Sequence, residues 1–538
     1  MKRAELLETL TRHGVYDLAV VGGGATGLGV ALDAALRGFS VVLLESHDFA
    51  GGTSSRSTKL LHGGVRYLAQ GNLALVREAL AERATVLRIA PHLAQPLPFV
   101  MPSYRWWQTP FYGLGLKLYD LLAGGAGLGR TEFLNREQAL QALPGVKPGG
   151  LRGGVKYWDG QFDDARLALA LARSAEAAGA CVLNYAEVTA VRQVQGADQP
   201  MSVLDVTDRR SATAFPLQAR CVVNATGVWV DALRDRTQPA ASQGGAPSHM
   251  VSPSQGVHVV VDRDFLPGGH ALLVPKTRDG RVLFAVPWLG KLVLGTTDTP
   301  RRDLPREPDA FAEELEFILS EASQALSRPV RREDIRSLWV GLRPLVAAPE
   351  AAEGGTKVLS REHTIVVDAN GLVTVTGGKW TTYRAMAEDV LERCFASRLL
   401  PHRAGGQSAA HVLLGAGATA SPVTPLHAPA GIHLYGTEAP QVVACPGQGN
   451  LLGAGLTEAM VRYAARFEYA QTVEDVLARR WRVLFLDAAE AARLAPAVAA
   501  ILAEELSGDP ELAAFQALCG RYLPVSAARV DAPNPSMP

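Results

Sequence analysis

Three glycines and one glutamate near the start of the chain have the types and spacing to bind a dinucleotide. Gly22, Gly24 and Gly27 form a G-x-G-x-x-G pattern directly after the apolar run Leu18–Val21. The first glycine permits a tight turn, the second lets the backbone approach a pyrophosphate, and the third lets a helix pack close to the strand. Glu45 ends a second apolar run, where its carboxylate can accept hydrogen bonds from both ribose hydroxyls and would repel a 2′-phosphate. The pattern predicts a site for FAD or NAD rather than NADP.

A second set of reactive side chains lies in the glycine-rich segment Gly51–Leu68. Its cationic and aromatic members are Arg56, Lys59, His62, Arg66 and Tyr67. Hydroxyl groups and glycine N–H groups in this segment can hold a pyrophosphate and the edge of a flavin, and the cations can face an anionic substrate. A solvated basic loop would have the same composition, so the segment alone leaves both interpretations open.

Two later turns could bring the backbone close to a bound ring system. The first is Ala225-Thr226-Gly227, and the second is Gly377–Gly378 in front of Lys379. A helix is expected to begin near Thr381, which would put its positive end beside the second turn. A reduced flavin carries negative charge near N1, and a helix N-terminus with a lysine beside it would stabilise that charge. A capped core helix explains the periodicity of this segment but not the Gly-Gly-Lys before it.

The elements that must position these residues begin with a strand, a helix and a second strand over residues 16–45. The expected apolar face of this helix consists of Leu28, Ala31, Leu32, Ala35 and Leu36. Gly38 is expected to end the helix before the β-branched Val41–Val42. A further helix is expected over Leu73–Ile89, with Pro91 as its stop. Short β-rich runs over residues 181–223 predict a hairpin layer that returns to this nucleotide domain.

Between about residues 240 and 345 the pattern is dominated by strands that Gly, Pro and Asp turns separate. The expected strands are Val257–Val261, Ala271–Val274, Val282–Val286 and Leu292–Leu294. This region therefore predicts a second, antiparallel domain. Two more strands, Thr364–Val367 and Leu372–Thr376, are expected to return to the first domain.

Charge and cysteine content argue against several classes of protein. The 538 residues contain 53 Lys plus Arg and 53 Asp plus Glu, so no global field favours nucleic acid. The five cysteines are odd in number and lack both C-x-x-C and metal-ligand spacing, which favours a reducing cytoplasm and gives no metal site. Glu5 and Glu8 lie where a signal peptide needs an apolar core, so secretion is not expected.

One segment could contact a membrane without crossing it. No run reaches the roughly 18 apolar residues of a spanning helix, and the nearest, Phe111–Gly129, is interrupted by Lys117 and Asp120. Because the aromatic and basic run YRWW at 104–107 precedes it, the segment could lie in a membrane interface. A buried hairpin of helices is the alternative.

In combination, the motifs resemble those of one flavoprotein family. They are VVGGGATGLG, TSSRSTKLLHGGVRYL, DDARL at 163–167, NATGVWV, GTTDT at 295–299, GLRPL at 341–345 and GGKWTTYR. Over about Tyr16 to Ala387 the chain resembles the FAD-dependent glycerol-3-phosphate dehydrogenases, within the broader glycine oxidase and amino acid oxidase type. The helical segment Val473–Asp487 resembles the C-terminal cap domain of that family. No family pattern is evident at 237–249, at 402–422 or after about 524.

The resemblance implies an α/β fold with a Rossmann-like FAD-binding domain, an antiparallel β substrate domain and an α-helical C-terminal cap domain. The expected boundaries are 15–240 and 345–398 for the FAD-binding domain, with part of the substrate domain within 90–160, then 241–344 for the substrate domain, 399–422 for a linker and 423–524 for the cap. Residues 525–538 are expected to be a disordered tail. Within the cap, Thr472 and Asp475 are expected to form an N-cap and its N3 acid, and Pro496 to break an Ala-rich helix.

The resemblance also implies oxidation of sn-glycerol 3-phosphate to dihydroxyacetone phosphate, with hydride passing from C2 to flavin N5. FAD contacts are expected at Gly22, Gly24, Ala25, Thr26, Gly27, Glu45, Thr53, Ser54, Ser57, Lys59, Leu61, His62, Gly63, Gly64, Ala225, Gly227, Gly378, Lys379, Trp380 and Thr381. Substrate contacts are expected at Arg66, Tyr67, Arg343, Arg361, Lys379 and Thr381. His258 is the first candidate for the base that takes the proton of the C2 hydroxyl, and Arg343 could instead lower the pKa of that hydroxyl. Lys379 completes the catalytic set.

The electron acceptor and the substrate class have alternatives. The family implies a membrane quinone and peripheral association with the inner face of the cell membrane, and it allows a homodimer. An oxidase that passes electrons to O₂ and makes peroxide would carry the same motifs. An amine or amino acid oxidase would share the fold, and a non-catalytic nucleotide-binding protein would lack a use for the cationic set.

Overall fold

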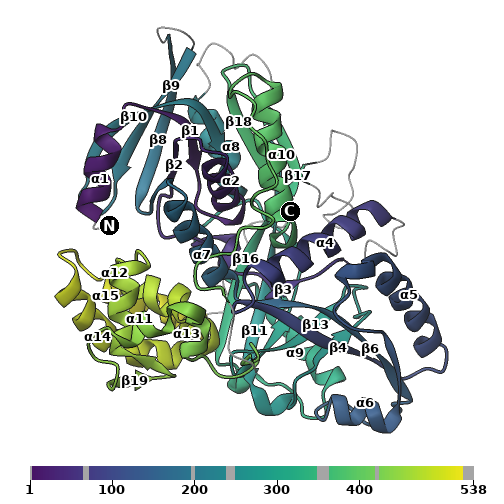
Figure 1. The fold of residues 1–538 in the computed structure, drawn as a ribbon. Helices are drawn as coiled ribbons and strands as arrows, with labels where there is room; N and C mark the ends of the chain where they lie inside the picture. Colours follow the sequence, from purple (N-terminus) through teal and green to yellow (C-terminus); the bar gives the residue numbers. More distant parts are fainter. Residues whose placement is uncertain are drawn as a thin grey trace.

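In the described residues the chain forms two large β-sheets and a mainly helical C-terminal domain with a two-stranded hairpin (Figure 1). The computed structural model describes residues 3–64, 72–195, 200–237, 249–347, 363–417 and 423–524. The expected disordered tail, 525–538, and the last part of the expected linker, 418–422, lie outside the described residues. The rest of the linker has neither helix nor strand, and it packs on the first domain because Leu413 lies in the apolar core of that domain.

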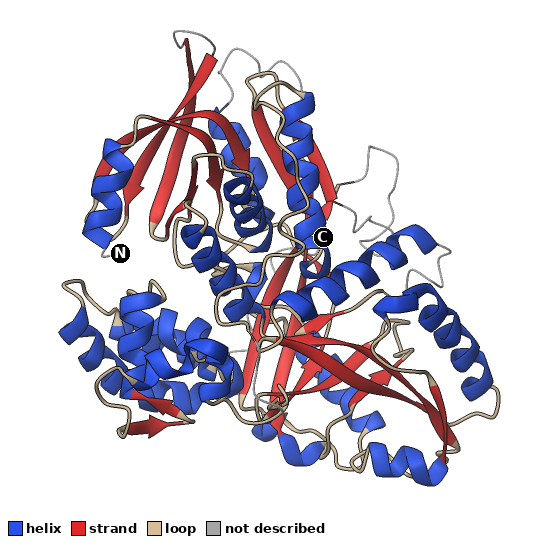
Figure 2. Ribbon diagram, viewed as in Figure 1, coloured by secondary structure: helices blue, strands red, loops and turns tan. Residues whose placement is uncertain are grey.

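The first sheet carries the glycine-rich turn, and its strand order in the described residues is β17-β18-β10-β1-β2-β7. The parallel strands are β1 (Val15–Val21), β2 (Val41–Leu44), β7 (Cys181–Leu183), β10 (Thr213–Asn224) and β18 (Leu372–Gly377). β17 (His363–Val367) pairs antiparallel with β18, and a hairpin of β8 (Ala186–Gln195) and β9 (Pro200–Asp208) pairs with β10. Figure 2 shows helices packed on this sheet.

Helices α2 (Ala25–Leu36), α7 (Asp164–Ala177) and α10 (Tyr383–Ala396) share one apolar core with a face of the first sheet. Helix α1 (Arg3–Arg12) packs on the opposite face, and α8 (Val230–Thr237) contacts β8 and β18. The predicted strand–helix–strand unit is confirmed. The expected apolar stripe of α2 was too narrow, since every residue from Gly27 to Ala35 is buried. The sheet, α7 and α10 surround this helix, so it buries nearly its whole circumference.

The second sheet combines strands from two separate stretches of sequence. The later stretch supplies β11 (Val251–Asp262), β12 (Ala271–Val274), β13 (Leu283–Trp288), β14 (Lys291–Gly295), β15 (Thr299–Pro300) and β16 (Ser337–Val346). The earlier stretch supplies β3 (Leu60–Leu61), β4 (Ala94–Ser103), β5 (Glu132–Asn135) and β6 (Gly153–Phe162). Described strand pairs in this sheet are antiparallel except β4 with β12. We propose that this sheet defines the substrate domain, with the part within 90–160 included.

Helices α4 (Leu73–Ile89), α5 (Gln108–Ala123), α6 (Arg136–Ala142) and α9 (Ala312–Ala325) accompany the second sheet. The helix predicted over Leu73–Ile89 is confirmed to the residue. The segment Phe111–Gly129 is not a buried hairpin of helices: α5 is one helix with a short 3₁₀ turn after it, and its outer side is exposed. No helix in the described ranges is both long and apolar enough to cross a membrane.

The C-terminal domain contains α11 (Ala439–Val443), α12 (Glu458–Phe467), α13 (Val483–Leu486), α14 (Ala488–Glu505) and α15 (Leu512–Tyr522), with a small hairpin of β19 (Leu451–Gly453) and β20 (Leu456–Thr457). The predicted helix N-cap at Thr472 is confirmed, because Asp475 N donates to Thr472 Oγ1 at 3.2 Å and Thr472 N donates to Asp475 Oδ2 at 3.1 Å. The expected break at Pro496 is wrong, since this residue lies inside α14. Burial of Leu494, Val498 and other apolar residues outweighs the lost backbone hydrogen bond.

Candidate active site

A cavity of about 500 Å³ opens at the carboxyl ends of the first sheet's parallel strands, where it meets the second sheet. Gly22 follows β1, Glu45 follows β2, Ala225 follows β10, and Gly377–Gly378 end and follow β18. Ligands of open α/β sheets bind at such an edge because loops there can diverge around them. The strands thus bring four of the predicted segments to one place.

The glycine-rich turn makes a backbone cradle at one wall of this cavity. Gly22 has a φ of +111°, and a Cβ there would lie 2.5 Å from the carbonyl oxygen of Ala225. A Cβ on Gly27 would collide with the carbonyl oxygen of Gly22. Gly24 is the N-cap of α2, so the positive end of this buried helix faces the cavity. The turn therefore requires glycine at positions 22 and 27, and the helix end that it exposes suits a phosphate.

The carboxylate of Glu45 lies at the next position along the cavity. Its Oε2 accepts a hydrogen bond from Gly23 N at 2.7 Å, and its Oε1 accepts one from His47 N at 2.9 Å. These bonds fix the carboxylate beside the glycine-rich turn, where it can receive ribose hydroxyls. The cradle, the helix end and the fixed acid together fit the phosphates and ribose of a dinucleotide.

The segment after Glu45 lines the cavity with small and hydroxyl side chains. Ser54 Oγ accepts a hydrogen bond from Ala25 N at 2.9 Å, and Thr53 Oγ1 donates to the carbonyl oxygen of Leu342 at 2.6 Å. Trp380 Nε1 donates to the carbonyl oxygen of Ser54 at 2.8 Å. These bonds join the loop to α2, to the second sheet and to the turn before α10, so hydrogen bonds connect the walls of the cavity to one another.

His258 and Arg343 line the cavity from neighbouring strands of the second sheet, β11 and β16. His258 Nε2 is 2.9 Å from Thr58 Oγ1, and its ring stacks on Trp339 with centroids 4.1 Å apart. Burial lowers the pKa of His258 well below its usual value, and the charges of Lys59 and Arg343 lower it further. The imidazole is therefore neutral at pH 7.

Arg343 is held in place by the loop after β14. Its Nη1 donates to Asp298 Oδ1 at 3.1 Å, and its Nη2 donates to the carbonyl oxygen of Thr297 at 2.8 Å. Lys379 and Thr381 line the same cavity, ahead of α10. Two cations, a neutral histidine and a hydroxyl thus line one cavity, which suits an anionic substrate that loses a proton.

The structure brings most, but not all, of the predicted site residues to the cavity. Those that line it are Gly22, Gly24, Ala25, Thr26, Glu45, Thr53, Ser54, Ser57, His62, Ala225, Gly227, His258, Arg343, Gly378, Lys379, Trp380 and Thr381. Those that do not line it are Gly27, Lys59, Leu61, Gly63 and Gly64. Arg66, Tyr67 and Arg361 lie outside the described residues.

Lys59 is the clearest departure from the expected cofactor contacts. Its Nζ donates to Asp164 Oδ2 at 2.7 Å and to the carbonyl oxygen of Ser55 at 2.8 Å, in a fully buried cluster under the loop. Burial lowers the pKa of Lys59 to about 7, although the Asp164 carboxylate opposes this. The buried carboxylate draws the ammonium away from the cavity, a contact that sequence spacing does not reveal.

Several cavity residues were missed from the sequence. Thr58 and Trp229 lie within predicted motifs but carried no assigned role, whereas Arg236 lies near the end of α8 and Arg306 in an irregular segment. Neither arginine belongs to a glycine turn or to an apolar periodic pattern. Their places follow from tertiary packing, so no local signal could have found them.

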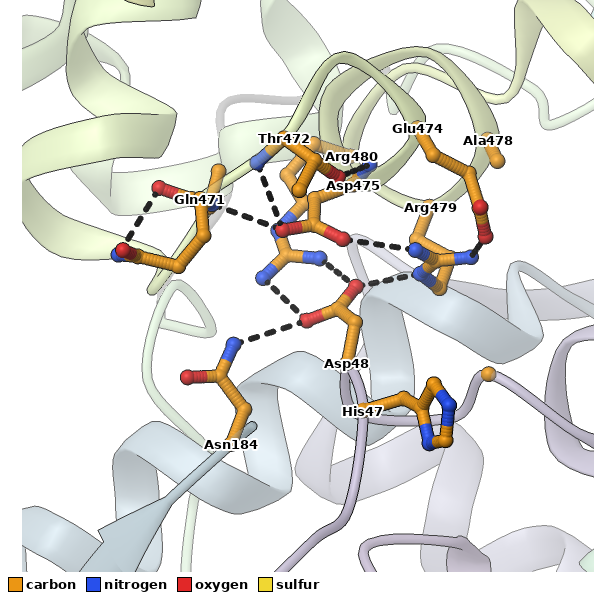
Figure 3. Close-up of polar contacts among 12 residues, drawn as sticks. His47, Asp48, Asn184, Gln471, Thr472, Glu474, Asp475, Ala478, Arg479 and Arg480 are labelled. Atoms are coloured by element: carbon orange, nitrogen blue, oxygen red, sulfur yellow. Dashed lines mark hydrogen bonds and ion pairs between the residues drawn. The ribbon is translucent and has the colours of Figure 1, made fainter. Parts of the chain in front are cut away.

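We call residues 45–59, between β2 and β3, the cofactor loop. A buried ion cluster joins this loop of the first domain to the C-terminal domain (Figure 3). Asp48 receives hydrogen bonds from Arg479 and Arg480, and Asn184 Nδ2 also donates to it at 3.2 Å. Arg479 Nη2 donates to Asp475 Oδ1 at 2.8 Å. The two arginines hold the pKa of Asp48 at about 2, below its usual value, even though burial opposes this. The cluster fixes the turn that begins at Glu45.

The fold and the cavity define an α/β flavoprotein with a second-sheet domain and a helical C-terminal domain. The profile of the family described as "FAD dependent oxidoreductase" matches residues 17–390, and that described as "C-terminal domain of alpha-glycerophosphate oxidase" matches residues 380–512. The chain belongs to the FAD-dependent glycerol-3-phosphate dehydrogenases, and its cofactor is FAD.

Relatives from animals, plants and fungi carry this identification. The chain is 39% identical to the mitochondrial glycerol-3-phosphate dehydrogenase of Macaca fascicularis, over 94% of this chain and 73% of the relative. It is 39% identical to that of Arabidopsis thaliana, over 92% of this chain and 83% of the relative. The glycerol-3-phosphate dehydrogenase of Bacillus halodurans, solved with FAD, superposes with a TM-score of 0.75 at 29% identity and covers 97% of this chain and 98% of that one.

Proposed function

We propose that the enzyme oxidises sn-glycerol 3-phosphate to dihydroxyacetone phosphate and delivers the electrons to a membrane quinone. The observation that carries the proposal is that His258, Arg343 and Lys379 line the same cavity. FAD, held by the glycine-rich turn, Glu45 and the hydroxyl-lined loop, would supply the acceptor for hydride from C2 at its N5. The other steps fall to side chains of the chain itself.

His258 is the proposed base. Removal of hydride from C2 requires loss of the proton on the C2 hydroxyl, and a neutral imidazole within hydrogen-bond reach can take it. The low pKa of His258 keeps the acceptor nitrogen free of a proton at pH 7, and Thr58 orients the ring through Nε2. Stacking on Trp339 restricts the imidazole to one plane.

Arg343, Lys379 and Thr381 are the proposed substrate contacts within the described residues. A phosphate monoester carries nearly two negative charges and needs charged donors as well as hydroxyls. The bond from Arg343 to Asp298 fixes the guanidinium while it faces the cavity. Arg66, Tyr67 and Arg361 complete the proposed set from segments outside the described residues.

Anaerobic stopped flow tests this assignment. Glycerol 3-phosphate should bleach the flavin absorbance of the FAD-loaded protein, and His258→Gln should slow bleaching at least 100-fold because it removes the base. His92→Gln is the matched control, since His92 is also buried and neutral but does not line the cavity. Equal rates for the two variants would exclude His258 as the base. Bleaching by an amino acid and not by glycerol 3-phosphate would overturn the proposed substrate. Stoichiometric peroxide formed in the absence of quinone would favour an oxidase.

The exposed side of α5 supports a membrane acceptor. Phe111, Leu114, Leu118 and Leu121 recur at helical spacing on this side, and Lys117 lies among them. Leu114 is 74% exposed and Leu121 76%, and Trp106, just before the helix, is 78% exposed. Aromatic rings, apolar side chains and a cation on one face suit the interface of an anionic membrane. We infer that α5 brings the protein to the membrane that holds the quinone.

Vesicle sedimentation tests the membrane proposal. The holoenzyme should pellet with vesicles of phosphatidylcholine and phosphatidylglycerol, and a Leu114→Glu, Leu121→Glu variant should remain in the supernatant. Leu451→Glu is the control, because Leu451 is 65% exposed on the C-terminal domain. Undiminished pelleting of the double variant, or equal loss with the control, would contradict the role of α5.

A further inference from the structure

A segment of the second-sheet domain crosses to the cofactor loop. Between β15 and α9 the chain runs through residues 301–310 without helix or strand, and we call this segment the strap. Trp229 Nε1 donates to the carbonyl oxygen of Leu304 at 3.1 Å, and Arg56 Nη1 donates to that of Arg306 at 3.0 Å. The backbone of the strap is therefore tied to the wall of the cavity.

One strap side chain, Arg306, points into the cavity beside Glu45, Gly51 and Gly52. Its Nη2 lies 3.2 Å from the position that a Cβ on Gly51 would occupy, and its guanidinium carbon lies 5.9 Å from the ring centroid of Trp229. No hydrogen bond or ion pair joins this side chain to any residue in the described ranges. In the part of the chain that the structure describes, the guanidinium thus faces the cavity with no carboxylate bonded to it.

The position of Arg306 calls for an anion from outside the chain. Burial lowers the pKa of its guanidinium, although the charge of Glu45 opposes this. A desolvated cation is costly unless an opposite charge approaches it, and the cradle of Gly22 and Gly24 already supplies N–H groups for phosphate. We propose that Arg306 pairs with the diphosphate of FAD. The inference rests on the assignment of this cavity to FAD.

The C-terminal domain holds the strap from its outer side. Glu307 accepts hydrogen bonds from Arg56 Nη2 and, at 3.2 Å, from Tyr522 OH on α15. Arg521 Nη2 donates to the carbonyl oxygen of Glu307 at 2.6 Å and to Asp309 Oδ1 at 2.9 Å. Arg521 and Tyr522 do not line the cavity, so they are positioning residues that act through the strap. Helix α15 thereby holds the strap, which carries Arg306, in place, and we call the contacts of Arg521 and Tyr522 with the strap the latch.

Cofactor affinity of the full chain tests the role of Arg306. FAD is stripped and rebound, and the dissociation constant is measured by quenching of flavin fluorescence at low and high NaCl. Arg306→Gln should raise the constant about 10- to 100-fold, the range for one hydrogen bond to a charged group, and should weaken its dependence on salt. Arg302→Gln is the control, since Arg302 is an exposed arginine of the same strap. It should bind FAD as the parent does.

ADP and adenosine identify the part of the cofactor that Arg306 meets. Arg306→Gln should weaken ADP binding and leave adenosine binding unchanged, because adenosine lacks the diphosphate. Equal loss for both ligands, or no loss of FAD affinity, would overturn the proposal. Glu45→Gln tests the assignment of the cavity to FAD. If neither Glu45→Gln nor Arg306→Gln changes the affinity for FAD, the assignment of the cavity fails. If Glu45→Gln weakens FAD binding and Arg306→Gln does not, only the role of Arg306 fails.

The latch is tested by the rate of FAD release. Arg521→Gln should speed release about 3- to 10-fold without contacting FAD, and Arg521→Lys should restore part of the parent rate because it keeps the charge opposite Asp309. The thermal midpoint of the stripped protein is measured in parallel. An unchanged release rate would overturn the latch, and so would faster release that tracks a lowered midpoint of the stripped variant.

Discussion

Two groups of arginines flank the cofactor loop, and they differ in what neutralises them. Arg479, Arg480 and Arg482 lie beneath the loop, and each is buried and bonded to a carboxylate of the chain. Arg306 and Arg343 line the cavity above it, and Arg306 has no carboxylate bonded to it within the described residues. Carboxylates of the chain thus neutralise the first group before any ligand binds.

This difference separates architecture from binding. A buried guanidinium with its carboxylate in place contributes to the docking of domains, and a ligand would gain little from it. A guanidinium that faces a cavity keeps its charge for an anion that arrives later. Arg343 combines both features, because Asp298 orients it while it lines the cavity. Variants of the two groups should therefore fail in different assays.

The largest effect is expected from the ion cluster beneath the loop. Arg480→Met leaves Asp48 with one guanidinium fewer in a buried site, so the free energy of unfolding should fall by about 3–5 kcal/mol. Chemical denaturation of the FAD-loaded protein measures it. The double variant Arg480→Met, Asp48→Ala should lose less free energy of unfolding than the sum of the losses of the two single variants, because the unpaired Asp48 charge is then gone. Additive losses, or a loss below about 1 kcal/mol for Arg480→Met, would contradict a charge-paired cluster.

A smaller effect, in a different assay, is expected in the cavity. Lys379→Met should raise the dissociation constant of glycerol 3-phosphate about 10- to 100-fold, because one charge-assisted contact is worth about 1.5–3 kcal/mol. The dependence of the flavin bleaching rate on substrate concentration gives this constant. The free energy of unfolding should change by less than about 1 kcal/mol. Loss of stability with an unchanged constant would place Lys379 with the structural group.

The sequence predicted the framework that positions both groups. Gly22, Gly24 and Glu45 lie where the G-x-G-x-x-G spacing puts them, because the backbone constraints of a phosphate turn are local. The helix over Leu73–Ile89 and the helix expected to begin near Thr381 follow from apolar periodicity, which is local as well. His258 and Arg343 were found by resemblance, and β11 and β16 then bring them together.

What the sequence could not predict depends on partners distant along the chain. Lys59 turns to Asp164, which lies 105 residues away, and Asp48 meets Arg479 and Arg480 more than 400 residues away. Pro496 remains inside α14 because the helix packs on the rest of its domain. Arg306 belongs to no motif. Charge pairing and packing between segments distant along the chain decided each of these positions, and spacing carries no information about either.

The smallest effect concerns buried histidine and pH. Burial and the charge of Arg166 lower the pKa of His92 to about 3, against about 6.5 in an unfolded chain. Between these values the unfolded state binds a proton that the folded state does not, so stability falls as the pH falls. From pH 7.5 to 5.5 the loss should be about 1.4 kcal/mol for this group. Denaturation at the two pH values should therefore show a loss about 1.4 kcal/mol smaller for His92→Gln than for the parent.

Comparison with His258 shows which measurement separates a structural histidine from a catalytic one. Its pKa is also lowered by burial, so His258→Gln should flatten the acid loss of stability in the same direction. Linkage depends only on the difference in proton binding between folded and unfolded states, and it does not distinguish a structural histidine from a catalytic one. The pH dependence of flavin bleaching does distinguish them: it should change for His258→Gln and remain that of the parent for His92→Gln. A changed bleaching profile for His92→Gln would mean that this histidine, near the junction with the C-terminal domain, also governs the chemistry of the cavity.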